Sequence, residues 1–405
     1  MEKQGVNLFG KLLLIAMAFG ILTPVIADAQ QDTEARIEKL ESELQALKAE
    51  RAESQPDWIR NIKISGDFRY RLESIDAETD GDWAKGHHRH RVRARFNIGT
   101  TLDEEWDLGF RLASGSADPA STNQTLSDSF SSKGFWLDLA YFDWHPLSVK
   151  DLNVFGGKMK NPFYKVGKTQ LVWDSDINPE GIAAKFVMPF GESDKLHING
   201  GGFWVDEDSG GVDTSLWGIQ AYLNHEFQNK QYVRGGLSYY DYGNIRGRGD
   251  LKSEWSSTGS FFGNTATGGT FDSDFDIVEG FVEYGFEYAG MPVSIFGNVV
   301  QNTVAGTGKD EGWLVGFNLN KAQAPGSWDF RYNYRDLEAD AVLGAFSHSD
   351  FIGGGTDGYG HEFGLNYQLT KNIQAGLTYF LSNRDRGGSS GDSYRRFQAD
   401  LRFKF

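Results

Sequence analysis

Six arginines of this sequence are spaced so that their side chains can act together. They fall in three short stretches and comprise Arg69, Arg71, Arg91, Arg93, Arg95 and Arg111. In an extended chain, residues two positions apart point to the same side, so each stretch presents its guanidinium groups on one face. Guanidinium groups bind carboxylates and phosphates, and a row of them in a confined space creates a positive field. The chemistry that this pattern predicts is the filtering or binding of charged solutes.

A second set of charged residues lies further along the chain, within residues 160–180. Asp174, Asp176 and Glu180 make this segment acidic. If the segment folds toward the arginines, its carboxylates face the guanidinium groups across a narrow aqueous gap. The resulting transverse field orients dipolar solutes and rejects apolar ones. Such a fold would form a constriction with an acidic side and a basic side. The alternative is that the segment lies on the exterior of the protein, where its carboxylates bind divalent cations between neighbouring lipopolysaccharide molecules.

The same segment places oxygen-bearing side chains at every second position, as calcium-binding loops do. Asp174, Asp176 and Asn178 could supply such ligands. An EF-hand would require Gly where Pro179 stands and Glu where Lys185 stands, so only a looser calcium site remains open. No other metal site and no cofactor is predicted.

Two further patterns match enzyme motifs in residue type and spacing but lack the structural context that those motifs require. Ser347, His348 and Asp350 are the residue types of a hydrolytic triad, but neighbours in one loop do not form a proton relay. The glycines of residues 353–358 have dinucleotide-binding spacing, yet they follow no buried strand and precede no helix. We predict that the protein is not an enzyme.

The elements that must position the charged residues are β-strands. Apolar and polar residues alternate in segments of about ten residues, which gives each strand one lipid-like face and one polar face. About sixteen such segments can be distinguished, near residues 62–73, 91–98, 106–115, 135–145, 150–159, 181–190, 195–205, 215–227, 231–242, 276–289, 292–302, 312–320, 327–336, 360–369, 373–383 and 394–405.

The connections between these segments alternate between short and long. Short turns such as 102–105 and 370–372 are followed by long Gly, Ser and Asp-rich loops such as 74–88, 116–133 and 337–358. This is typical of outer-membrane barrels. The predicted fold class is therefore all-β, a transmembrane antiparallel β-barrel of about 16 strands, with residues 160–180 as its third long loop.

A barrel also determines which way the charged residues face. An arginine on the lipid side costs about 2–4 kcal/mol near the membrane midplane, so the arginines must face the lumen. Because the last strand pairs with the first, Lys63, Arg396, Arg402 and Lys404 are predicted to extend them into one basic wall. Glu279, Glu283 and Glu287 are predicted to add negative charge on the opposite wall.

The chain before the barrel has two parts. Residues 1–29 combine Lys3 and Lys11, an apolar run and a small-x-small site near Ala29, which predicts a cleaved secretory signal. Residues 30–55 carry apolar residues at alternating spacings of three and four, which predicts a periplasmic coiled coil. Its seam comprises Ile37, Leu40, Leu44 and Leu47. The alternative is a single amphipathic helix lying on the protein. The barrel is predicted for residues 56–405.

Composition excludes several other classes. The chain has 405 residues, no Cys and a formal net charge of -16. The absence of Cys excludes disulfides and thiolate zinc sites, and the acidity argues against a nucleic-acid binder. The mean hydropathy of -0.46 excludes a helical membrane protein but not a barrel, whose alternating strands average to a polar chain.

The chain ends in alternating apolar and polar residues that close on Phe405. This ending resembles the assembly signal of bacterial outer-membrane barrels. Together with the sixteen segments and the helix, it resembles the sixteen-stranded porins, in particular a group with an N-terminal periplasmic coiled coil. The resemblance implies a homotrimer in the outer membrane of a Gram-negative bacterium, inserted by the barrel-assembly machinery among lipid and lipopolysaccharide. It also implies a third loop that narrows each pore, although the acidic-glycine motif of the general porins is missing.

The predicted function is a passive aqueous channel for small hydrophilic solutes and ions, with no nucleic-acid partner. The arginine spacing leaves a second hypothesis open, a channel specific for anions such as phosphate or organic acids. A third, from another class, is an envelope tether or adhesin that uses the coiled coil and the long outer loops.

Overall fold

The computed structural model describes residues 36–46, 56–79, 81–83, 86–249, 251, 261–384 and 391–405. The predicted signal segment and Leu47 of the predicted seam lie outside the described residues. The chain divides into two compact units, residues 1–60 and 61–405. None of the helices in the described part of the chain is both long and apolar enough to cross a membrane.

In the first unit, residues 36–46 are helical and α2 spans Asp57–Arg60. Ile37, Leu40 and Leu44 lie on the first helix and are 50%, 58% and 52% exposed. These three seam residues therefore form an exposed apolar row on a charged helix. Pairing of this row with a second helix stays a prediction.

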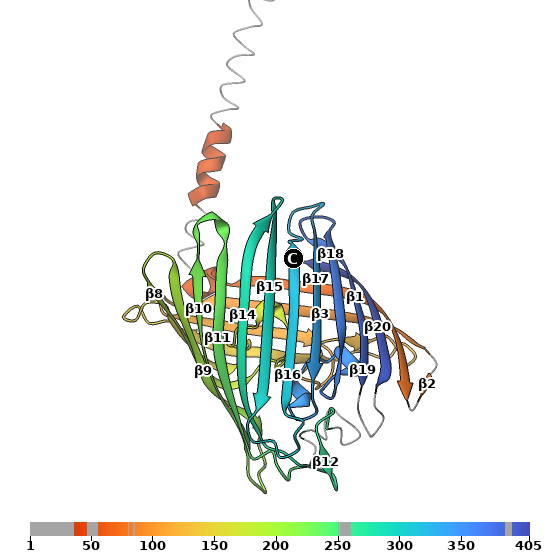
Figure 1. Cartoon of the computed structure of the whole chain (residues 1–405). Helices are drawn as coiled ribbons and strands as arrows, with labels where there is room; N and C mark the ends of the chain where they lie inside the picture. The colour runs from red at the N-terminus through yellow and green to blue at the C-terminus, as the bar shows by residue number, and fades with distance from the viewer. Residues whose placement is uncertain are drawn as a thin grey trace, which may run out of the picture. The chain divides into compact units, whose positions relative to one another are not determined.

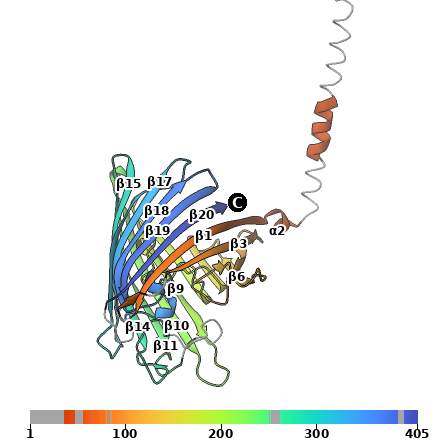
Figure 2. The same cartoon turned by 90° about the vertical axis from the view of Figure 1, so that its right-hand side faces the viewer.

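The second unit is a closed barrel of sixteen antiparallel strands (Figure 1). Its strands are β1 (Lys63–Thr79), β3 (His87–Thr101), β4 (Trp106–Ser114), β6 (Phe135–Trp144), β7 (Leu152–Lys158), β8 (Glu180–Phe190), β9 (Asp194–Asp206), β10 (Thr214–Glu226), β11 (Tyr232–Gly243), β14 (Phe275–Tyr288), β15 (Met291–Asn302), β16 (Glu311–Asn320), β17 (Trp328–Leu337), β18 (Gly358–Gln368), β19 (Ile373–Arg384) and β20 (Asp392–Lys404). β20 pairs with β1, from Asp67 opposite Lys404 to Ala77 opposite Tyr394, and so closes the ring (Figure 2).

The remaining elements are short and lie in connections. They are β2 (Asp82–Trp83), β5 (Gln124–Thr125), β12 (Ala266–Thr267) and β13 (Thr270–Phe271), with the 3-10 turns η1 (Val166–Lys168), η2 (Gln228–Lys230), η3 (Gly344–Phe346) and η4 (Phe351–Gly353).

The alternation of apolar and polar residues explains why these segments form a barrel. On β14, Val278 and Val282 are 40% and 54% exposed on the outer face, whereas the residue that follows each of them, Glu279 and Glu283, is buried inside. The tightest turn, Ala289 and Gly290, has positive φ at both residues, the geometry of a two-residue hairpin. The predicted all-β fold and the number of strands are confirmed.

The first outer connection differs from the prediction. Residues 74–88 were expected to form a long loop, but β1 continues to Thr79 and β3 begins at His87. Ser74 pairs with His88 on one side and with Phe397 of β20 on the other. Pairing on both sides satisfies the backbone of this polar stretch, which extends the sheet beyond the alternating segment.

β7 is the shortest of the sixteen strands, and the loop that follows it enters the lumen. β7 pairs with β6 only from Ala140 to Trp144 and ends at Lys158. Within loop 159–179, Phe163 and Trp173 are buried against Tyr240 of β11, with ring centroids 5.0 and 5.4 Å apart. The apolar core of the molecule thus lies inside the barrel, between this loop and the inner faces of the strands it covers.

Candidate pore constriction

The six predicted arginines share one stretch of the inner wall, because β1, β3 and β4 are neighbours in the barrel. Arg69 lies directly opposite Arg93, and Arg71 opposite Arg91. Like charges in direct cross-strand positions repel each other, so this stretch of wall needs carboxylates close by.

The same wall supplies them. Asp67 accepts hydrogen bonds from Arg93 at 2.8 Å and from Arg95 at 2.7 Å. Asp400 of β20 accepts two from Arg71, at 2.7 and 2.9 Å. The wall is therefore mixed in charge, and the prediction that it is basic throughout is wrong. Asp67 and Asp400 occupy the same inward positions as the arginines beside them, so this signal was present in the sequence.

Glu73 extends this mixed character toward the outer end of β1. It accepts a hydrogen bond from Arg396 at 2.6 Å and forms an ion pair with Arg89. Arg402 in turn donates to Asp400 at 2.7 Å.

Asp176 is the loop carboxylate that faces the arginines. Its Oδ1 lies 3.7 Å from Nη1 of Arg95, and its Oδ2 accepts hydrogen bonds from the backbone and hydroxyl of Thr122. Burial by itself would raise the pKa of Asp176, but the positive charges of Arg93 and Arg95 outweigh burial and hold this pKa below its ordinary value. Asp176 is therefore ionised at neutral pH.

The other two predicted acidic residues lie elsewhere. Asp174 is 3% exposed and accepts hydrogen bonds from the backbone N–H groups of Asp176 and Ser349, each at 2.8 Å. Burial, helped by the charge of Asp176, raises the pKa of Asp174 to about 7. Asp174 thus lies behind Asp176, against loop 338–357, and does not face the arginines.

Glu180 is on the outer side of the wall. It begins β8, bonds Lys158 at 2.6 Å, and shares a face with Ile182, whose side chain is 59% exposed. The loop has already rejoined the sheet at this residue, so Glu180 belongs to β8 and its place in the constriction stays a prediction.

The constriction contains one carboxylate that the sequence did not reveal, that of Asp138. Asp138 of β6 forms an ion pair with Arg111 and accepts a hydrogen bond from Asn178 at 2.8 Å. The register of β4 and β6 shifts beside Arg111, and this irregularity leaves Asp138 without a cross-strand partner. A simple alternation cannot show a β-bulge, so Asp138 could not be placed from the sequence.

The ion pairs contribute to the linings of two cavities. One of about 280 Å³ is lined by Asp138 and Asp176, and one of about 480 Å³ by Arg95 and Arg111. Each of the Arg95–Asp176 and Arg111–Asp138 pairs therefore has one partner in the lining of each cavity.

Of the three carboxylates predicted for the opposite wall, Glu287 is exposed and accepts a hydrogen bond from Lys230 at 2.7 Å, whereas Glu279 and Glu283 are buried. Glu283 accepts hydrogen bonds from the hydroxyls of Tyr164 and Tyr232 at 2.6 and 2.9 Å. Glu279 accepts bonds from Ser238 and Asn298. Both are buried, so their expected contribution to the lumen charge is not observed.

The residues considered for calcium already satisfy one another. The oxygens of Asp174 and Asp176 accept the bonds described above, and the Asn178 amide nitrogen donates to Asp138 and to the Asp176 carbonyl. A calcium ion is not required to stabilise this segment.

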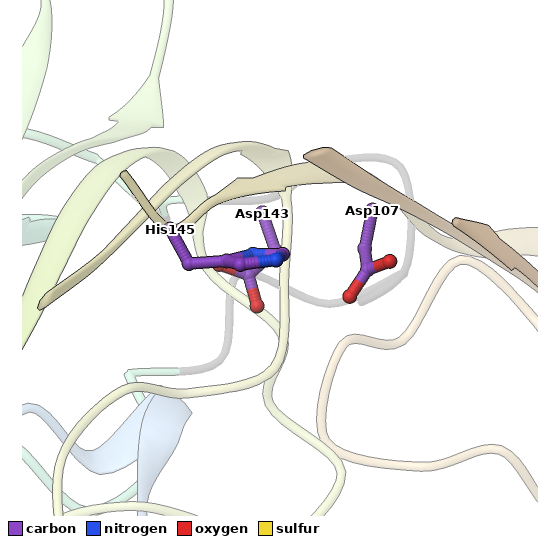
Figure 3. Close-up of side chains that lie close together, drawn as sticks. All are labelled: Asp107, Asp143 and His145. Atoms are coloured by element: carbon purple, nitrogen blue, oxygen red, sulfur yellow. The ribbon is translucent and has the colours of Figure 1, made fainter. Parts of the chain in front are cut away.

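Within the described ranges, one group could supply three metal ligands. It consists of Asp107 of β4, Asp143 of β6 and the adjacent His145 (Figure 3). Asp107 and Asp143 are cross-strand partners, and Asn153 donates to both oxygens of Asp143. An imidazole with two carboxylates suits a divalent transition metal. Both oxygens of Asp143, however, already accept hydrogen bonds from the Asn153 amide.

A closed sixteen-stranded barrel with a charged constriction defines the class of outer-membrane channels. The sequence profile of the family described as "Putative porin" matches residues 81–274 and 280–405, and the chain belongs to this family. A search of curated proteins found no significant relative.

Solved porins share the fold. The Pseudomonas putida OprB structure is 12% identical, with a TM-score of 0.56 over 86% of this chain and 95% of that one. Salmonella typhi OmpF, in complex with daunomycin, is 11% identical, with a TM-score of 0.52 over 85% and 98%.

Proposed function

We propose that the protein is a passive outer-membrane channel for small hydrophilic solutes and ions, which filters them by size and by a transverse field. The observation that carries this proposal is the Arg95–Asp176 contact of 3.7 Å, made between the barrel wall and a loop inside the lumen. Arg111 and Asp138 form an ion pair between two neighbouring strands of the wall, and Asp138 also accepts a hydrogen bond from Asn178 of the loop.

The proposed mechanism follows from opposite charges held in a confined space. Water in the lumen beside the Arg95–Asp176 pair is oriented by the field of the two charges, and a solute must displace this water to pass. A polar solute replaces the lost hydrogen bonds with its own, whereas an apolar solute does not. The channel therefore admits small polar solutes and excludes apolar ones of similar size.

A second candidate is a channel specific for anions such as phosphate or organic acids. It is favoured by the larger cavity, which Lys63 and Lys160 line together with Arg95 and Arg111. Neither lysine has an ion-pair partner among the described residues. A micromolar concentration of inorganic phosphate that blocks the current would favour this candidate, and a current linear in salt concentration would favour the general pore.

The assembly is proposed from the family resemblance. The protein is exported with cleavage near Ala29, is inserted into the outer membrane with Phe405 as its assembly signal, and forms a homotrimer. The helix that bears Ile37, Leu40 and Leu44 contributes a periplasmic coiled coil, and the outer surface contacts lipopolysaccharide. The competing hypothesis of a tether or adhesin predicts envelope defects on deletion of residues 33–55, with no measurable current.

Solute flux into liposomes tests the channel directly. Vesicles that contain the purified full-length protein should swell in small uncharged sugars, at rates that fall steeply as the sugar becomes larger. Swelling no faster than that of protein-free vesicles would refute the proposed function.

A further inference from the structure

Loop 338–357, which joins β17 to β18, is an outer loop by sequence but an internal element in the structure. Its residues Asp340, Ala341, Val342, Phe351 and Ile352 are at most 1% exposed. An exposed loop tip would not bury charged and apolar side chains to this extent. The loop therefore lies within the barrel rather than above it.

Packing fixes the loop on two sides. Phe351 and Ile352 form an apolar cluster with Phe380, which is an inward residue of β19. The buried guanidinium of Arg335 lies 4.5 Å above the Phe351 ring and donates to Glu362 at 2.6 Å. The loop thus covers an ion pair that would otherwise stand in the lumen.

The loop also joins loop 159–179. Asp174 donates its backbone N–H to the Phe346 carbonyl at 2.7 Å and accepts the Ser349 N–H at 2.8 Å. The rings of Phe346 and Trp173 stack with centroids 6.1 Å apart. The two internal loops therefore form one hydrogen-bonded body.

This body reaches across the lumen. Phe346 contacts Tyr242 of β11, with ring centroids 6.3 Å apart. Asp350, four residues later, contacts Arg71 of β1 at 3.1 Å and Arg396 of β20 at 2.7 Å. β1 and β11 are eight positions apart in the ring of sixteen strands, so they lie on opposite sides of the barrel. The chain from Phe346 to Asp350 can extend over about 14 Å, and the two side chains cover the rest of the distance between the walls. The loop therefore bridges opposite walls.

We propose that loop 338–357 is a second constriction element and that Asp350 is a selectivity-determining residue, which reduces the positive charge that the arginine wall presents to permeating ions. The proposal rests on the proposed channel function. Besides Arg71 and Arg396, Gln398 donates to Asp350 at 2.9 Å. Arg71 and Arg396 also contact two other carboxylates, Asp400 and Glu73 respectively. The imidazole of His348 lies two residues before Asp350 on loop 338–357.

The side chain of Asp350 is 19% exposed, so solvent in the lumen reaches it. A unit charge in water changes the concentration of a monovalent ion about 7 Å away by roughly threefold. Removal of the Asp350 charge should therefore raise the permeability ratio of anions to cations by at least about twofold.

The test is the reversal potential of Asp350→Asn in a potassium chloride gradient across a planar bilayer, compared with the wild type. The matched control is Asp208→Asn, which removes one carboxylate from the exposed loop 207–213. The proposal requires a shift toward anions in Asp350→Asn and none in the control. Equal potentials in the wild type and in Asp350→Asn would overturn it.

A second variant covers the case in which Asp350→Asn does not fold. Ser349→Cys changes one atom, and the chain has no other Cys. An anionic and a cationic methanethiosulfonate reagent of similar size should both lower the conductance of this variant and move its reversal potential in opposite directions. An unchanged current after complete labelling would refute the second constriction. If the wild type itself conducts no current, the channel function fails, which is a separate outcome.

Discussion

Replacement of Asp176 by Asn should make the channel markedly more anion-selective. The carboxylate lies 3.7 Å from Arg95 and also interacts electrostatically with Arg93 and Arg69. At this separation, a unit charge contributes about 1 kcal/mol in bulk water and roughly 4 kcal/mol at an effective dielectric constant of 20. A cation that passes Asp176 at a similar distance loses at least the lower of these energies. Its permeability should therefore fall by about fivefold or more relative to that of chloride.

The assay is the reversal potential in a salt gradient at pH 6, with Asp174→Asn as the matched control. Both substitutions convert an Asp of the same loop to Asn. Because the pKa of Asp174 is raised to about 7, its carboxyl is mostly protonated at pH 6, and Asn replaces a neutral group. The control should keep the wild-type potential. If both variants shift equally, or if Asp176→Asn does not shift, the assignment of Asp176 to the permeation path is wrong.

Three further predictions follow from the same contacts. Glu180→Gln should leave the reversal potential unchanged and alter the unfolding free energy by no more than about 1 kcal/mol, because Glu180 is itself exposed in its ion pair with Lys158; a shift comparable to that of Asp176→Asn would contradict this. The pKa of Asp174 rises from an ordinary 3.8 to about 7 on folding, so the stability that its protonated form contributes should be lost as pH rises from about 4 to about 7, and Asp174→Asn should flatten the dependence of thermal stability on pH in that interval. Trp173→Ala should cost about 3–5 kcal/mol of packing against Tyr240 and raise single-channel conductance by loosening the loop; an unchanged conductance would show that the loop does not limit the pore.

The sequence predicted the barrel well because one physical rule governs every strand. A lipid-facing wall demands apolar residues at alternate positions, and the same alternation identifies the inward face. Arg69, Arg93 and Arg95 were placed on the lumen side for this reason, and the structure has them there.

The constriction could be predicted only in part. Asp176 lies on the loop that was predicted to fold toward the arginines, and its carboxylate contacts Arg95. Asp138 was missed because a bulge gives no periodic signal. Asp350 was missed because its loop is rich in small and polar residues, as exposed loops are, and only tertiary contacts with Arg71 and Arg396 show that it is internal.

Single-channel recording of the purified wild-type protein in a planar lipid bilayer tests the central claim most directly. A water-filled constriction lined by the Arg95–Asp176 pair predicts discrete, long-lived conductance steps that grow with salt concentration, and a threefold grouping of closures if the protein is a homotrimer. A folded, inserted barrel that produced no steps in any salt would contradict the account.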